Sequence, residues 1–532
     1  MSSATTFVAY GPSRGALRAA PATPYVIVVT LAVASLTASL LSNGNLLAAV
    51  APILMAAALW LACKAPLRVS IGVVMFVALA VDRPGDADGH FVTPLNTVGG
   101  MLFHNLNHVI GIEALRFSGV FALLALLLGV RFWRRLVGRV RDTAGSLLPA
   151  SPLTWSLALA VVTLAASIGF GALRGGDIQM AKIQTQAFLQ LVAVAYLFSV
   201  SLRGRRDYAW LGTLIVTAAA IKSVLALWVR AVLPPAFPDQ WGVMRELEYT
   251  TNHGDSLLFA CAAAVLLGPL FHAPTRRQLV TLILVGSLLV AGIIANDRRI
   301  AWVQVALVAA AFVIMNPAST VTRRLARTAV LASPLLLAYV VVGWSSPSRI
   351  FAPVGFVRNL VQPVRSDGSL DRSTLFRDVE NFNLVTTFMG NPVLGTGFGH
   401  PFTMAVEGDA LTEFKEYMYL PHNSTVGLWA FTGLAGYTGI FACVVVGMLL
   451  ALQAHRRARH ADEAVATAAA VGSLAAYAVH LWADIGFTEA PTIFLVGLAL
   501  AIAGQAATAT GVWPAPDSVD SVATRRATGV HA

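Results

Sequence analysis

The sequence predicts an all-α membrane protein: a polytopic bundle of about 12–14 transmembrane helices with one large loop outside the cytoplasm. The chain of 532 residues is 57% hydrophobic and only 12% charged, with a mean hydropathy of +0.71. Soluble domains carry about 25% charged residues, so this composition excludes an ordinary soluble protein. The apolar residues also fall in long runs between short polar segments, as they do in membrane spans.

About 14 of these runs come near the length of about 20 residues that a helix needs to cross a bilayer. The segment before the first run is polar and the run itself is long, so we expect a retained span and no cleavable signal. The expected spans are 24–41, 46–63, 69–81, 108–130, 152–170, 183–202, 208–232, 253–271, 279–295, 300–315, 329–344, 423–452, 467–482 and 491–507.

The basic residues predict the orientation of these spans. With the N-terminus in the cytoplasm, alternate loops hold the Lys and Arg clusters, as the positive-inside rule requires. The clusters lie at 64–68, 131–135, 203–206, 276–277, 323–327, 456–459 and 525–526. Both termini are therefore expected in the cytoplasm, and the net charge of +11 reflects topology, not nucleic-acid binding.

The same count divides the chain into four parts. We expect transmembrane helices in residues 1–344, an extracytoplasmic loop domain in 345–421, further spans in 422–510 and a disordered cytoplasmic tail in 511–532. Within the loop, 371–389 is predicted to be a helix because Leu375, Val379, Phe382 and Met389 share one face. This amphipathic helix lies along the membrane surface, caps a cavity or packs against the bundle.

Gly395, Gly397 and Gly399 form a glycine-rich segment after this helix. A nucleotide-binding loop needs a strand before it and a helix after it, and neither is expected here. We expect instead a tight turn in which backbone approaches backbone, which glycine permits.

Arg298 and Arg299 break the charge rule, because they lie in a tight turn on the outer side. The flanking spans are short, so the guanidinium groups are expected near or slightly below the lipid headgroups. Ionisable residues at that depth in a membrane are costly and usually functional. One interpretation is a phosphate clamp, since the guanidinium group pairs bidentately with phosphate oxygens. The alternative is a snorkelling anchor or an ion pair with Asp297.

Two further arginines are candidate phosphate contacts. Arg245 lies in the outer loop 233–251, where Glu246 or Glu248 offers a competing ion pair. Arg372 lies near the start of the helix predicted in the large loop, where a solvated charge is the competing interpretation.

His422 and Asn423 follow Pro421 at the start of the span 423–452. Proline suits the first turn of a helix, so His422 is predicted at the helix N-terminus, where the helix dipole lowers the pKa of an imidazole. A neutral imidazole there suits a general base, with Asn423 orienting the ring or binding a sugar hydroxyl. The alternative is that the pair caps the helix.

Cofactors are not expected. The three cysteines have neither a disulfide framework nor zinc-type spacing, and the outer segments lack DxD, HExxH and paired-histidine motifs. Arginine side chains would then stabilise a leaving group in place of a metal ion.

Three ordered motifs carry a resemblance: 391–399 (Asn-Pro-Val-Leu-Gly-Thr-Gly-Phe-Gly), 420–424 (Leu-Pro-His-Asn-Ser) and 433–436 (Gly-Leu-Ala-Gly). Together they resemble the O-antigen ligase and O-antigen polymerase superfamily, over about residues 251–439. Residues 297–302 resemble its arginine motif, with Asp-Arg-Arg where the family usually has Ser-Arg-Gly, so either Arg298 or Arg299 is the equivalent. Arg372 also holds a typical family position.

The resemblance implies a GT-C-like glycosyltransferase of the bacterial inner membrane. It would take a glycan from undecaprenyl pyrophosphate on the periplasmic side and pass it to a hydroxyl of another glycan, of the lipid A core or of a protein. His422 would be the general base, and Arg298 or Arg299 would bind the substrate together with Arg372. Arg245 and Asn423, considered above from their positions alone, are further candidate substrate contacts. Its partners are membrane lipid and these substrates, not nucleic acid.

Two other functions compete with this one. A flippase for lipid-linked oligosaccharides predicts an internal repeat and charges near the bilayer midplane, whereas the notable charges here gather at the outer face. A non-catalytic assembly subunit predicts that His422→Ala leaves the surface polysaccharide unchanged.

Overall fold

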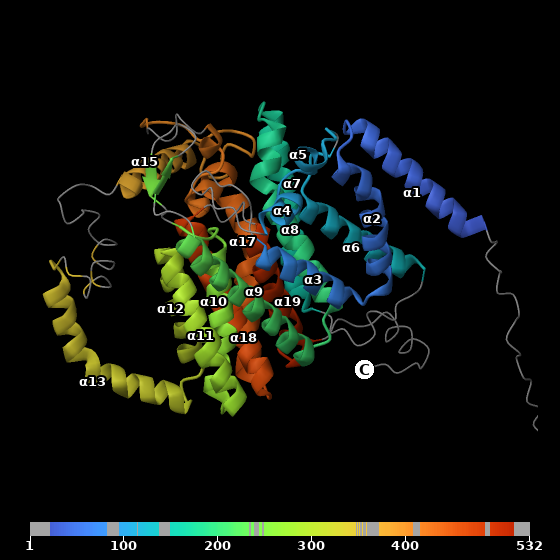
Figure 1. Cartoon of the computed structure of the whole chain (residues 1–532). Helices are drawn as coiled ribbons and strands as arrows, with labels where there is room; N and C mark the ends of the chain where they lie inside the picture. The colour runs from blue at the N-terminus through green and yellow to red at the C-terminus, as the bar shows by residue number, and fades with distance from the viewer. Residues whose placement is uncertain are drawn as a thin grey trace, which may run out of the picture. The chain divides into compact units, whose positions relative to one another are not determined.

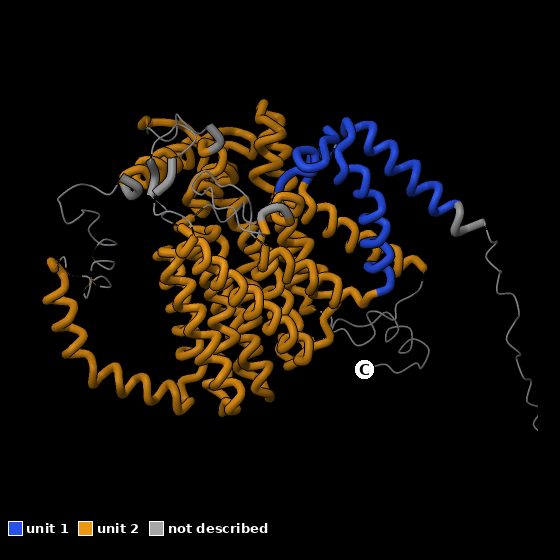
Figure 2. The backbone as a smooth tube through the Cα atoms, in the orientation of Figure 1, with its two compact units in different colours: residues 1–64, 104–117 blue, residues 65–103, 118–532 orange. Residues whose placement is uncertain are grey.

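The computed structural model describes residues 22–81, 95–113, 115–137, 149–232, 236–238, 244–246, 249–346, 348, 351, 354, 358, 372–407, 415–484 and 490–514. Most of the predicted tail, 515–532, lies outside these ranges. The chain divides into two compact units (Figure 2). One comprises residues 1–64 and 104–117, and the other comprises residues 65–103 and 118–532.

The smaller unit is a helical hairpin with a short third helix. It contains α1 (Ala22–Leu41), α2 (Leu46–Lys64) and α5 (Leu106–Ile110). Asn43 and Gly44 have positive φ in the turn between α1 and α2. The next residue, Asn45, caps α2 by accepting from Leu47 N at 2.9 Å and donates to Val109 O at 3.1 Å, which ties α5 to the hairpin.

The larger unit holds the other helices (Figure 1). They are α3 (Leu67–Ala80), α4 (Asn96–Phe103), α6 (Gly119–Leu136), α7 (Ser151–Leu173), α8 (Ile178–Ser201), α9 (Arg205–Val232), α10 (Asp255–Leu267), α11 (Arg276–Asn296), α12 (Arg299–Met315), α13 (Thr320–Gly343), α15 (Arg372–Gly390), α17 (Ser424–Arg457), α18 (Ala461–Ala483) and α19 (Ala490–Ala509), with the short helices η2 (Gly268–His272) and η4 (Lys415–Met418). The strands β1 (Ala236–Pro238) and β2 (Met244–Glu246) pair antiparallel.

The helices confirm the predicted fold class, a polytopic all-α membrane protein. In the described residues, ten helices are long and apolar enough to cross a membrane. Three shorter apolar helices, Val26–Leu41, Leu67–Ala80 and Arg299–Met315, bring the total into the predicted range. The expected span 108–130 is wrong as a single helix. α5 ends at Gly111 in the left-handed conformation, and α6 starts only after Ser118, whose side chain accepts from Phe121 N.

The C-terminal helices form the core of the larger unit. The apolar span of α19 is 89% buried, and α19 packs against α8, α17 and α18. Both α18 and α19 are rich in alanine and glycine, which let membrane helices approach closely. In contrast, no residue in the apolar span of α13 is buried. The core therefore fixes the ends of α17 and α18, where the candidate site lies.

α15 packs against α17 with its polar face. Glu380 and Asn383 are fully buried, whereas Phe382 is 56% exposed and Met389 is 68% exposed. The predicted apolar face therefore exists, but it faces away from the bundle. Packing against the bundle is confirmed, and the opposite side of the helix makes the contact.

Candidate functional site

His422 lies in the loop before α17 and not in the helix. Asn423 is the N-cap residue: its Oδ1 accepts from Val426 N at 3.1 Å, and the helix begins at Ser424. The prediction that His422 starts the helix is therefore wrong. The side chain of Asn423 caps the helix, and this hydrogen bond outweighs the preference of Pro421 for a first helical turn. The capping interpretation is confirmed for Asn423.

Glu380 of α15 holds His422 at two points. Its Oε2 accepts from the backbone N of His422 at 3.0 Å, and its Oε1 lies 3.2 Å from Nδ1 of the imidazole. The Glu380 side chain is fully buried, while 17% of the His422 side chain is exposed. When Nδ1 donates to the carboxylate, Nε2 is the nitrogen that accepts. Within the described residues Nε2 has no hydrogen-bond partner, so it is the nitrogen left for a substrate.

Aromatic rings enclose the imidazole on two sides. Phe376 meets it edge-on with ring centroids 5.4 Å apart, and Tyr417 lies at 5.0 Å. Together with the two contacts to Glu380, these rings fix the plane of the histidine side chain. A general base needs such a fixed orientation because proton transfer depends on geometry.

The same face of α15 organises the loop ahead of His422. Asn383 Oδ1 accepts from Ala405 N and Val406 N, both at 2.9 Å. Thr387 Oγ1 accepts from Thr403 N at 2.8 Å. Glu380, Asn383 and Thr387 thus form one polar stripe at helical spacing. The sequence interpretation used only the apolar stripe of this helix and missed Glu380, although the polar stripe was visible beside it.

The glycine segment is a tight turn between backbones, as predicted. Gly395, Gly397 and Gly399 have φ values of +68°, +86° and +91°. Gly397 N donates to Phe431 O at 2.8 Å, and Asp177 N donates to Gly399 O at 2.9 Å. The turn thus joins α17 to the connection between α7 and α8.

Gln184 of α8 positions both loops of the site. Its Oε1 accepts from Gly399 N at 2.6 Å, and its Nε2 donates to Tyr419 O at 2.9 Å. The side chain is buried and bridges the glycine turn to the segment that leads to His422. Nothing in the sequence singled out this glutamine, because its partners lie more than two hundred positions along the chain.

Gly397→Ala is expected to destabilise the protein more than Gly175→Ala. Both glycines have positive φ, so each substitution carries the strain of about 1–3 kcal/mol that this conformation imposes on other residues. A Cβ at Gly397 would also lie 2.4 Å from Gly171 Cα, whereas a Cβ at Gly175 meets nothing within 4 Å. Thermal unfolding of both variants in detergent measures the difference. Equal apparent Tm values would mean that the contact with Gly171 does not matter.

Arg298 lies in a buried polar cluster. Only 7% of the residue is exposed, and its guanidinium carbon lies 3.9 Å from the ring centroid of Tyr249. Nη1 is 2.6 Å from Nδ1 of His253, and Nη2 donates to Thr251 O at 3.4 Å. The cation–π contact and the bond to Thr251 orient the guanidinium group within the protein.

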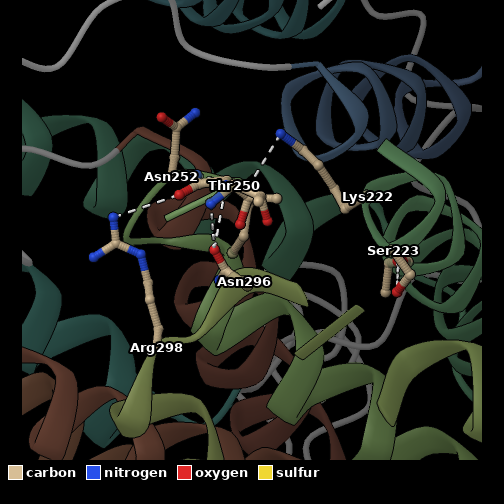
Figure 3. Close-up of polar contacts among 9 residues, drawn as sticks. Lys222, Ser223, Thr250, Asn252, Asn296 and Arg298 are labelled. Atoms are coloured by element: carbon tan, nitrogen blue, oxygen red, sulfur yellow. Dashed lines mark hydrogen bonds and ion pairs between the residues drawn. The ribbon is translucent and has the colours of Figure 1, made fainter. Parts of the chain in front are cut away.

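Asn296 and a buried ion pair hold the segment that meets Arg298 (Figure 3). Asn296 Oδ1 accepts from Thr251 N at 3.1 Å. Lys222 Nζ lies 3.3 Å from Asp255 Oδ2, which also accepts from Asn252 N at 3.2 Å. Side chains of α9, α10 and α11 therefore converge on the loop that carries His253.

Asp484 connects this cluster to the start of α17. Its carboxylate contacts His253 Nδ1, and its backbone O accepts from Ser424 Oγ at 3.0 Å. Burial alone raises the pKa of the Asp484 carboxyl. The positive charge and hydrogen bond of His253, with the charges of His480 and Arg298, outweigh burial and hold the pKa below its usual range. A continuous series of hydrogen bonds and close contacts thus runs from His422 through Ser424, Asp484 and His253 to Arg298.

The other predicted site residues lie at the edges of this arrangement. Arg299 is exposed at the start of α12. Within the described residues no ion pair joins Asp297 to either arginine, so the predicted ion pair is wrong, whereas the snorkelling anchor stays a prediction. Arg245 lies in β2 and Arg372 begins α15, but the side chains of both are outside the described residues. The side chains of Glu246 and Glu248 are also outside the described residues, so the competing ion pair with Arg245 stays a prediction.

Among the described residues, no group of three or more His, Cys, Asp or Glu side chains is placed to hold a metal ion. Comparison of the chain with models of known protein families gives no match. A search of curated proteins likewise gives no match.

Proposed function

We propose that this chain is a membrane glycosyltransferase of the O-antigen ligase and polymerase type. The donor is a glycan on undecaprenyl pyrophosphate, and the acceptor is a hydroxyl of a glycan, of the lipid A core or of a protein. The observation that carries the proposal is the Glu380–His422 pair. Its imidazole has a fixed ring, one nitrogen on a buried carboxylate and the other available. The motifs at 391–399 and 420–424 supply the family resemblance.

In the proposed reaction, Nε2 of His422 takes the proton from the acceptor hydroxyl. The hydroxyl oxygen then forms a bond to the anomeric carbon of the donor sugar. The bond between that carbon and the pyrophosphate oxygen breaks, and undecaprenyl pyrophosphate leaves with the electron pair. Glu380 stabilises the imidazolium that forms, as the carboxylate does in a Ser-His-Asp triad.

The leaving pyrophosphate gains negative charge, and Arg298 is the proposed group that stabilises it. Its Nε is buried and has no hydrogen-bond partner within the described residues, so this donor remains for a ligand. A fixed cation in a buried site stabilises developing charge better than one that must reorganise. Arg299, Arg245 and Arg372 are proposed as further contacts to the lipid-linked donor, and Asn423 as a support of the loop.

We place the protein in the bacterial inner membrane, with both termini in the cytoplasm and the site on the periplasmic side. The charge pattern supports this orientation. α11 begins at the basic pair Arg276 and Arg277 and ends at Asn296, within the Arg298 cluster. The basic end of the helix is the expected cytoplasmic end, so the cluster lies at the other.

Transfer is expected to persist when divalent metals are removed. The test uses the purified chain in vesicles with an undecaprenyl-pyrophosphate-linked glycan and an acceptor, and measures the glycan product with and without EDTA. Full activity with EDTA supports leaving-group stabilisation by arginine. Strict dependence on added magnesium or manganese would contradict it. Glycan profiling of a deletion strain then separates a polymerase, which sets chain length, from a ligase, which attaches the chain.

A further inference from the structure

A cavity of about 730 Å³ lies between α9, α10, α11, α18 and α19, away from the candidate site. α11 begins beside the cavity, where Arg277 lines it, and ends at Asn296 in the Arg298 cluster. α18 likewise begins beside it at Ala461 and ends next to Asp484. The cavity is therefore at the opposite end of the bundle and is not the donor site proposed above.

Small apolar side chains create this space. Ala466, Ala469 and Ala470 of α18 line it, with Gly212 of α9 and Ala499 of α19. Its size falls within the range of about 300–1,000 Å³ that is usual for ligand pockets. All five helices are candidate membrane spans, so hydrocarbon chains are the molecules expected around the bundle that they form. An empty apolar void forfeits dispersion contacts, and a lipid chain restores them.

Two buried polar atoms in the lining have no partner within the described residues. Tyr208 is only 8% exposed, yet its hydroxyl has no hydrogen-bond partner there. Nε2 of His272 is also buried and unpartnered in that part of the chain. Both residues line the cavity. Buried polar groups are nearly always hydrogen-bonded, so this pair points to the polar head of a ligand.

The charges at the cavity favour a zwitterionic head. Arg277 and Asp462 both line the cavity and both are exposed. An arginine suits a phosphate, and a carboxylate suits an ammonium group. The bilayer core is as apolar as the cavity walls, so burial of the acyl chain adds little selectivity for one lipid over another. The contacts of the polar head therefore decide which lipid binds.

We propose that this cavity binds one membrane phospholipid of the phosphatidylethanolamine type. Its acyl chain lies among the alanines of α18, and its phosphate bonds Tyr208, His272 and Arg277. This site is independent of the glycosyltransferase proposal, so loss of lipid binding and loss of transfer are separable results.

The test is photolabelling of the full chain in phosphatidylethanolamine vesicles that contain a trace of the same lipid with a diazirine in its acyl chain. Mass spectrometry should map the label to α9, α18 and α19 residues that line the cavity. Ala469→Phe fills the space and should lower this labelling to the level of lipid-exposed positions. Ala478→Phe, at an exposed position on the same helix, should leave it unchanged.

Tyr208→Phe tests the head contact without changing the cavity volume, and it should also lower labelling. A diazirine diacylglycerol, which lacks the phosphate, should label the cavity less than phosphatidylethanolamine does. Equal labelling in wild type, Ala469→Phe and Tyr208→Phe would overturn the proposal. Equal labelling by the two lipids would overturn it as well, because the head would then have no role.

Discussion

His422→Ala is expected to lower the rate of glycan transfer by about 10²–10⁴-fold, the usual contribution of a positioned general base. Removing the imidazole removes the only proposed proton acceptor for the hydroxyl. The measurement is transfer by the purified variant in vesicles, normalised to the amount of folded protein. His460→Ala is the matched control, since His460 is exposed and its side chain makes no cap bond to α18. Full activity of the His422 variant would exclude it as the base.

Glu380→Gln is expected to lower the rate of glycan transfer nearly as much as His422→Ala does, but for a different reason. One carboxylate oxygen of Glu380 accepts the backbone N–H of His422, so the amide oxygen of glutamine is expected to take that place. The amide NH₂ then faces Nδ1 and forces the ring proton onto Nε2. That tautomer cannot accept a proton from substrate, and the corresponding change in a serine-protease triad lowers kcat by about 10⁴. Normal transfer by this variant would mean that Glu380 does not select the tautomer.

Arg298→Ala is also expected to have a large effect, a loss of about 10²–10³-fold in transfer, as for removal of one preorganised donor to a developing charge. Arg299→Ala should lose less, because Arg299 is exposed and outside the cluster. Arg298→Lys keeps the charge but loses the planar fork, so an intermediate rate is expected. The readout is kcat and KM for the lipid-linked donor, measured in the same vesicles.

Truncation of Arg298 also disturbs His253, so stability must be separated from catalysis. Asp484→Asn removes the carboxylate from the same cluster and contacts the ligand in neither proposal. If Arg298→Ala and Asp484→Asn unfold at the same temperature but only the former loses transfer, the loss is catalytic. Full activity of the Arg298→Ala, Arg299→Ala double variant would contradict the phosphate clamp.

Some features of the site followed from local sequence. The glycine turn at 395–399 was predicted because a positive φ is a property of single residues, and these glycines adopt it. Asn423 as a cap was one of two stated alternatives, and capping is likewise local. The start of α17 was misjudged by two residues because Pro421 and Asn423 offer competing start signals, and the asparagine hydrogen bond decides between them.

The sequence by itself determined that this is a multi-pass membrane protein, because hydrophobicity over about 20 residues is sufficient to specify a span. It also placed His422 and Arg298 at the same end of the bundle, through the alternation of basic loops. Only the tertiary structure decided which polar groups meet. Glu380 reaches His422 across 42 positions, and His253 reaches Asp484 across 231. Such pairs depend on how each helix is rotated about its axis, which is set by packing against its neighbours. For α15, that packing buried the polar face and left the apolar face exposed.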